Sequence, residues 1–145
     1  MTLTIRIALA ILFLNELIVG AWNQFFPRSF YDTFPTVDLT PPFSEHYARD
    51  FGGATLGIAV LLGIALITAK ASWILPATIA YTVFSIPHFV FHAAHLEHTT
   101  PGEAVFLLIG NAVVALLGLL ALALTLLRDR LSPRYAPERS RATPR

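Results

Sequence analysis

The chain contains no cysteine. Disulfide bonds, cysteine-ligated zinc, iron–sulfur clusters and thiol catalysis are therefore excluded. Histidine, aspartate and glutamate are the side chains that remain for binding a metal ion. Any metal site in this chain depends on those three residue types.

Charged side chains are scarce as well. Only 13% of the 145 residues are charged, whereas 55% are hydrophobic and the mean hydropathy is +0.64. A soluble domain carries roughly a quarter charged residues, so this composition indicates an integral membrane protein in contact with a lipid bilayer. The net charge of +1 and the lack of a basic, aromatic patch give no sign of nucleic-acid binding.

Four apolar runs are each long enough to cross a bilayer as a helix. The predicted spans are residues 3–21, 48–69, 73–95 and 103–127. They predict an all-α fold, a four-helix transmembrane bundle that forms one domain over residues 1–127. Residues 128–145 hold six arginines and three prolines without periodicity, which predicts a disordered basic tail.

A cleaved signal peptide is an alternative for the first run. The sequence Val19-Gly20-Ala21 resembles a cleavage site. Against cleavage, Asn15 and Glu16 interrupt the end of the apolar region. The transmembrane interpretation is therefore preferred.

The connection from Trp22 to Tyr47 is rich in aromatic residues and is broken by four prolines. Pro27 suits the first position of a short helix, which would put Phe30, Tyr31 and Phe34 on one face. Rings in such a segment are typical of the headgroup zone of a membrane. The segment is interpreted either as an aromatic belt or as a lid over a pocket between the helices.

Two features of the middle helices concern packing. The second helix, which Thr40 or Ser44 could cap, contains Gly53-x-x-x-Gly57, a spacing that allows a neighbouring helix to approach closely. Pro87 lies deep in the third helix and is expected to kink it.

The basic residues predict the orientation in the membrane. Arg6, Lys70 and the six tail arginines, eight of the ten basic residues, fall on one side of the four spans. Arg28 and Arg49 fall on the other side. The positive-inside rule then places both termini in the cytoplasm and the aromatic connection outside the cytoplasmic membrane.

Four of the five histidines lie between Ser85 and His98. His88, His92 and His95 are spaced i, i+4, i+7, so a helix would put them on one narrow face. These histidines form the most distinctive polar feature of the predicted spans.

The polar residues of the other spans fall at a similar depth, in the outer half of the bundle. Polar groups in a membrane usually face the bundle interior or a wet cavity. The sequence therefore predicts an outward-facing polar pocket; separate interhelical hydrogen bonds with snorkelling side chains are the alternative. Arg49 and Asp50 are interpreted as a salt bridge or as an anion contact. The candidate site residues are Asn15, Glu16, His46, Arg49, Asp50, His88, His92, His95 and Asn111.

Several functions are compatible with such a pocket. The preferred hypothesis is binding of a lipid-like or quinone-like ligand, in membrane redox or envelope metabolism, because an apolar bundle with a polar rim suits such molecules. A divalent metal held by His88, His92 and His95, completed by Glu16 or Asp50, would instead make a metal-dependent enzyme. Glu16 with His92 could also move a proton on a lipid-like substrate. The last alternative is an accessory or assembly subunit with a membrane-protein partner or a second copy of the chain.

Two stretches resemble known proteins. Residues 44–53 (SEHYARDFGG) and 86–96 (IPHFVFHAAHL) resemble a family of small four-helix membrane proteins of actinobacteria that carries no assigned function. More remotely, residues 5–14 and the glycine-rich second helix resemble DoxX-like proteins, some of which are associated with quinone-linked sulfur oxidation. That resemblance implies a membrane-redox role, although the histidine stretch has no counterpart in it.

Overall fold

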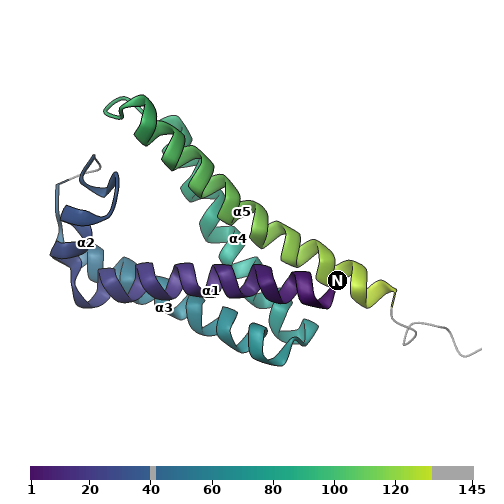
Figure 1. Ribbon diagram of the computed structural model, residues 1–145. Coiled ribbons are helices and arrows are strands. Elements are labelled where there is room, and N and C mark those ends of the chain that lie inside the picture. Colours follow the sequence, from purple (N-terminus) through teal and green to yellow (C-terminus); the bar gives the residue numbers. More distant parts are fainter. Residues whose placement is uncertain (40–41, 132–145) are drawn as a thin grey trace, which may run out of the picture.

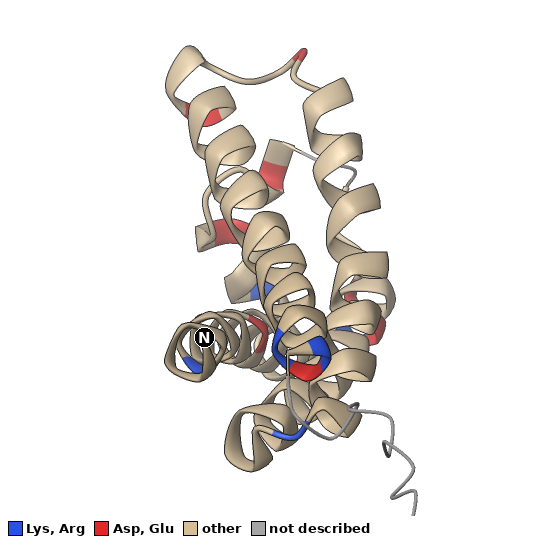
Figure 2. Cartoon of the chain, turned by 90° about the vertical axis from the view of Figure 1, so that its right-hand side faces the viewer, with Lys and Arg blue, Asp and Glu red and all other residues tan. Residues whose placement is uncertain are grey.

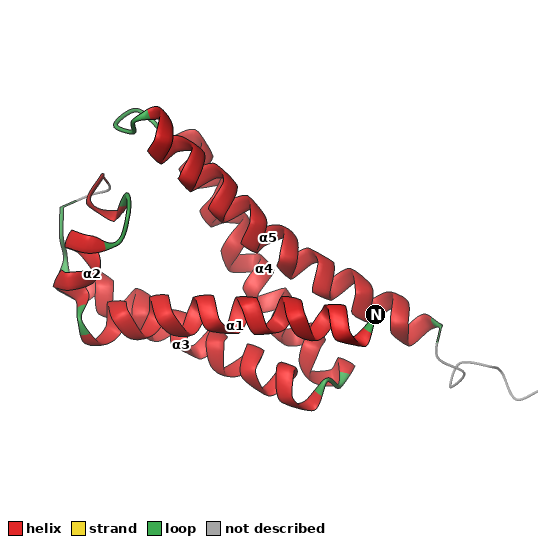
Figure 3. Cartoon of the chain, in the orientation of Figure 1, coloured by secondary structure: helices red, strands yellow, loops and turns green. Residues whose placement is uncertain are grey.

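A computed structural model describes residues 1–39 and 42–131. These residues form helices joined by short connections (Figure 3). In chain order the elements are α1 (Thr2–Phe25), α2 (Pro27–Thr33), the 3₁₀ helix η1 (Val37–Leu39), α3 (Glu45–Thr68), α4 (Ala71–Ala94) and α5 (Pro101–Arg130).

Helices α1, α3, α4 and α5 are each long and apolar enough to cross a membrane. By these four candidate spans the chain is a multi-pass membrane protein, and the predicted all-α class is confirmed. Many large apolar side chains on the helix surfaces are exposed, as expected where lipid replaces water. Helix α1 continues to Phe25, four residues past the predicted end at Ala21, and α5 continues to Arg130 instead of Leu127. The rest of the predicted tail, residues 132–145, lies outside the described residues.

Local capping explains where three helices begin. The Ser44 hydroxyl accepts a hydrogen bond from the Tyr47 backbone N–H at 3.5 Å, so Ser44 caps α3. Thr100 and Glu103 form a reciprocal capping box at the start of α5. Pro27 occupies the first turn of α2, as predicted.

The four long helices are arranged as two antiparallel pairs. Helix α1 packs along α3, and α4 packs along α5 (Figure 1). The two pairs meet near the N-terminus and the end of α5, which we call the terminal end of the bundle. They diverge toward α2 and the α4–α5 turn, which we call the loop end (Figure 1).

The close contact between α1 and α3 depends on two glycines. A Cβ atom built on Gly52 would lie 2.5 Å from the Gln24 backbone N, and one on Gly20 would lie 3.0 Å from the Leu56 backbone N. The predicted close contact at Gly53 and Gly57 is therefore wrong, because the neighbouring Gly52 makes it instead. A Cβ atom on Gly57 would meet nothing within 4 Å, because that face of α3 points away from α1.

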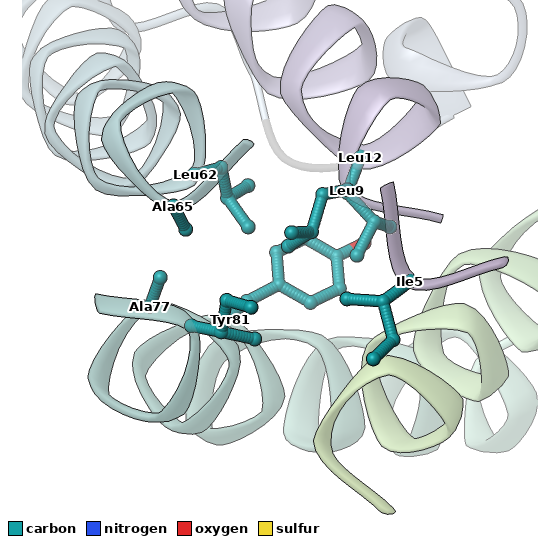
Figure 4. Packing of buried hydrophobic residues seen from close by; sticks show 8 residues of the cluster. Ile5, Leu9, Leu12, Leu62, Ala65, Ala77 and Tyr81 are labelled. Atoms are coloured by element: carbon teal, nitrogen blue, oxygen red, sulfur yellow. The ribbon is translucent and has the colours of Figure 1, made fainter. Parts of the chain in front are cut away.

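An apolar core fills the terminal end, where the two pairs meet. The Tyr81 ring lies among aliphatic side chains of α1 and α3, as Figure 4 shows. A Cβ atom on Gly118 of α5 would lie 2.8 Å from this ring, so α5 closes the core from the fourth side. The buried members of the core are Ile5, Leu9, Leu12, Leu62, Ala65, Ile74, Ala77 and Tyr81.

Hydrogen bonds of arginine side chains tie the helix ends together. At the terminal end, Arg128 Nη1 donates to the Ala69 carbonyl oxygen at 3.2 Å. At the loop end, Arg49 Nη1 donates to the Gln24 carbonyl oxygen at 2.6 Å. The α4–α5 turn carries one acidic residue, Glu97, and no Lys or Arg (Figure 2).

The substitution Gly52→Ala is expected to destabilise the fold by about 1–3 kcal/mol, the usual range for overpacking a tight contact. The added methyl group would press against the backbone of Gln24, which cannot move without separating α1 from α3. Gly57→Ala is the matched control, because it adds the same group where nothing lies within 4 Å. Thermal unfolding in mild detergent, followed by circular dichroism, measures both; equal stability of the two variants would contradict this packing.

Candidate functional site

A pocket of about 700 Å³ lies between the two helix pairs, toward the loop end. All four long helices contribute to its wall, together with α2 and the segment that leads to α3. Along α5 the wall extends from Phe106 to Val114, about 12 Å at 1.5 Å per residue. The aromatic residues of the wall are Phe30, Tyr31, Phe34, Phe43, Tyr47, Phe51, Tyr81, Phe84, Phe91 and Phe106.

Two polar side chains of the pocket wall are almost completely buried. Glu16 of α1 is 2% exposed and Ser85 of α4 is 3% exposed. Asn15 Nδ2 donates to Glu16 Oε1 at 3.0 Å, whereas Glu16 Oε2 and Ser85 Oγ have no hydrogen-bond partner among residues 1–39 and 42–131. Buried polar atoms without a partner are uncommon in native proteins and call for an explanation.

His88 and His92 continue the polar strip along α4 from Ser85 toward the loop end. The His88 ring stacks on Phe84 with 5.2 Å between centroids, and its edge contacts the His92 ring at 4.5 Å. His92 also lines a second hollow of about 440 Å³, to which His95 contributes. The two histidines therefore lie where the pocket meets this hollow.

The predicted three-histidine metal site is absent from the described part of the chain. No three His, Asp or Glu side chains among residues 1–39 and 42–131 are grouped to hold a metal ion. Helix α4 ends at Ala94, and the backbone of His95 is not helical, so the i, i+7 relation to His88 is lost. The His95 ring instead stacks on Phe91 at 4.2 Å, and its Nδ1 lies 2.8 Å from the Phe91 carbonyl oxygen.

The aromatic connection covers the pocket at the loop end. Trp22 contacts the edges of Phe30 and Phe34, which stack on each other at 4.8 Å. Tyr31 contacts Phe43 at 5.4 Å, and the Arg28 guanidinium lies over both of those rings. Of the two interpretations of this segment, the geometry matches the lid, because four of these rings line the pocket.

Three predicted site residues of α3 lie outside the pocket wall. His46 and Asp50 form an exposed i, i+4 pair at 3.3 Å, with 81% and 65% of their side chains accessible. Arg49 pairs with Glu45 at 2.7 Å, so the predicted Arg49–Asp50 salt bridge is wrong. The reason is helical geometry.

The pocket face of α3 is set by Tyr47, Ala48 and Phe51. At 3.6 residues per turn, positions 46 and 49 point to the opposite side of the helix. The prediction that His46, Arg49 and Asp50 of α3 converge on the pocket is therefore wrong.

The structure does bring five of the predicted residues together in one wall. Asn15 and Glu16 come from α1, His88 and His92 from α4, and Asn111 from α5. Asn111 Nδ2 donates to the Leu107 carbonyl oxygen at 2.9 Å, which satisfies part of its amide within the helix.

Sequence reasoning missed Ser85, Asn23 and Tyr81. Ser85 lies three residues before His88, on the same helical face, so the face argument could have included it. Asn23 was assigned to the loop because α1 was predicted to end at Ala21. Tyr81 is completely buried, and nothing in the sequence distinguishes it from a tyrosine at the membrane surface.

Comparison of the chain with protein-family models, with curated proteins and with solved structures gave no significant match.

We expect Ser85→Ala to raise the unfolding free energy of the ligand-free protein by about 1 kcal/mol. Burying an unsatisfied polar group costs about 1–3 kcal/mol, and the substitution removes that group while leaving only a small void. Thr78→Val is the control, since the buried Thr78 hydroxyl already donates to the Ile74 carbonyl oxygen at 2.7 Å. Thermal unfolding of both variants tests this; a Ser85→Ala protein less stable than the parent would contradict it.

Proposed function

We propose that this membrane protein binds a lipid-like or quinone-like amphiphile in the pocket between its two helix pairs. The observation that carries the proposal is one cavity with aromatic walls on which Glu16, Ser85, His88 and Asn111 converge from three helices. Sites for small molecules are mostly apolar, have volumes of about 300–1,000 Å³ and contain a few polar groups that fix the ligand. The volume of about 700 Å³ lies inside that range.

An acid–base enzyme acting on a lipid-like substrate is the second candidate. Glu16 and His88 line the same pocket, so a carboxyl group and an imidazole both face a bound molecule. A proton could then be removed from one position of a substrate and delivered to another. The metal-dependent form of this hypothesis has no three-ligand set among the described residues.

We also propose that the loop end faces outward and that both termini are cytoplasmic. The basic residues support this orientation: Arg6, Lys70 and Arg128 lie at the terminal end, and the other tail arginines follow Arg128 in the sequence. At the loop end, Arg28 and Arg49 are each paired with a carboxylate of their own helix. In this orientation the pocket lies in the outer half of the membrane, beneath the aromatic connection.

The orientation predicts a labelling pattern that the cysteine-free chain makes simple to measure. Glu97→Cys places a single thiol at the loop end and Ser72→Cys places one at the terminal end; both positions are exposed. On intact cells, a membrane-impermeant maleimide should label Glu97→Cys and not Ser72→Cys. After permeabilisation both should react, which controls for accessibility, and the reverse pattern on intact cells would contradict the orientation.

Filling the pocket should displace the ligand without disturbing the helix contacts. A side chain at Gly110 would extend into the pocket, since a Cβ atom there meets nothing within 4 Å. Gly110→Leu is therefore expected to lower the amount of co-purifying amphiphile by about 5- to 150-fold, the equivalent of about 1–3 kcal/mol of overpacking.

Gly57→Leu is the matched control, because Gly57 is equally open but does not line the pocket. Both proteins are purified in mild detergent, and the extracted lipids are quantified by mass spectrometry. Equal ligand content in the two variants, or none in the parent protein, would contradict the proposed function.

A further inference from the structure

We infer that the pocket takes an uncharged ring lipid that enters with an oxygen atom foremost. This oxygen accepts a hydrogen bond from the Ser85 hydroxyl and, where it belongs to a hydroxyl group, donates one to the Glu16 carboxyl group. This inference rests on the proposed function and specifies the ligand of the same site. It follows from three properties of the pocket: its unsatisfied polar atoms, the charges missing from its wall and the aromatic rings of its sides.

The unsatisfied polar atoms locate the ligand oxygen. Glu16 Oε2 and Ser85 Oγ are the buried oxygens of the pocket wall that lack a partner in the described chain. They come from different helices, α1 and α4, and both belong to the wall of the same pocket. Neither atom is accessible to water. If the two side chains rotate toward a ligand, the Ser85 hydroxyl can donate to a ligand oxygen and Glu16 Oε2 can accept from a ligand hydroxyl.

Asn15 supports this arrangement from the side. Its amide donates to Glu16 Oε1 at 3.0 Å, which holds one carboxyl oxygen and leaves the other for the ligand. Asn15 is therefore a positioning residue. A buried carboxyl fixed in this way is suited to one oriented hydrogen bond.

The composition of the wall excludes a phosphate headgroup. Phosphate is recognised by arginine and lysine side chains, which provide charge-assisted hydrogen bonds. No Lys or Arg from the described ranges lines the pocket. Arg28, which lies over the Tyr31 and Phe43 rings, is paired with Asp32 at 2.7 Å, and the Arg49 side chain is directed to Glu45 and to the Gln24 carbonyl. An anionic phospholipid head beside the Glu16 carboxyl would have no cation to balance it.

The aromatic sides of the pocket favour a flat ring. Phe84 and His88 already stack on each other beside Ser85, and Phe51 contacts Phe84 at 5.9 Å. Aromatic rings gain from offset stacking and edge contacts in addition to the area they bury. A ring whose oxygen reaches Ser85 would lie against this cluster. An acyl chain would gain neither stacking nor edge contacts from it.

Trp22 provides a fluorescent reporter for the test. The chain has two tryptophans, and Trp22 contacts Phe30 and Phe34 of the pocket wall. The other tryptophan, Trp73, lies in the first turn of α4 at the terminal end. Trp73→Phe therefore leaves a single emitter beside the pocket, in the otherwise complete chain.

Two quenching probes distinguish the ligand classes in detergent solution. A decyl-substituted benzoquinone represents a ring lipid with carbonyl oxygens, and a phosphatidylglycerol with brominated acyl chains represents a phospholipid. We expect the quinone to quench Trp22 fluorescence saturably in the Trp73→Phe protein. Quenching by the phospholipid should be equally strong in the Trp73→Phe protein and in its Gly110→Leu derivative, because it does not depend on the pocket. The quinone affinity should fall roughly fivefold to tenfold in Ser85→Ala, because that variant loses the hydroxyl that donates to the quinone oxygen.

Thr78→Val is the control variant, because Thr78 is buried on α4 but does not line the pocket, and its quinone affinity should equal that of the parent. Unfolding temperatures are recorded for every variant.

The possible outcomes separate this inference from the proposed function. Saturable quenching by the phospholipid that Gly110→Leu abolishes, without quenching by the quinone, would overturn the inference and leave the proposed function intact. Quinone binding that Gly110→Leu abolishes but that Ser85→Ala leaves unchanged would overturn the assigned oxygen position. The absence of saturable quenching by either probe would overturn the inference, and lipid extraction from the Gly110→Leu protein then judges the proposed function by itself.

Discussion

Hydrocarbon offers no hydrogen-bond partner, and this constraint organises the whole molecule. Inside a bilayer, backbone polar groups must be satisfied by the chain itself, which restricts the spans to helices. The same requirement governs polar side chains: Thr78, Thr125 and Asn111 each donate to a carbonyl oxygen of their own helix. Against this background the unpartnered oxygens of Glu16 and Ser85 are exceptions, and both belong to the pocket wall.

The way in which the helices pack also depends on the lipid that surrounds them. Lipid tails are as apolar as leucine, so helices associate through close van der Waals contact at small residues and not through the hydrophobic effect. Gly20 and Gly52 supply that contact between α1 and α3, and Gly118 receives the Tyr81 ring between α4 and α5. Both of these contacts lie within a pair of helices. The two pairs meet each other through the apolar core at the terminal end and diverge toward the loop end, where the pocket lies between them (Figure 1).

Much of the fold could be predicted because hydrophobic run length alone identifies membrane spans. The face that each helix turns toward its neighbours was harder to predict. A period of 3.6 residues identifies the residues that share a face but not the face that meets a neighbour. Gly53 and Gly57 were preferred for their spacing, yet Gly52 makes the contact. Helix ends were the other source of error: α4 ends before His95, which removes that ring from the histidine face, and α1 continues far enough to bring Asn23 into the pocket wall.

The unsatisfied carboxyl and hydroxyl oxygens make the folded protein less stable, and they therefore call for a functional explanation. Substitutions that satisfy or remove buried polar groups are readily available to a protein, and stability alone would favour them. A pair of such groups from two helices in one cavity wall is therefore better explained by a bound molecule that completes their hydrogen bonds than by packing. Because the described pocket wall contains no Lys or Arg, a completing group with a negative charge would have no cation beside it, whereas the exposed ion pairs of Arg28 and Arg49 lie outside the wall. Ion pairs and unpartnered oxygens thus occupy different parts of the loop end, the first at exposed positions of α2 and α3 and the second in the pocket wall.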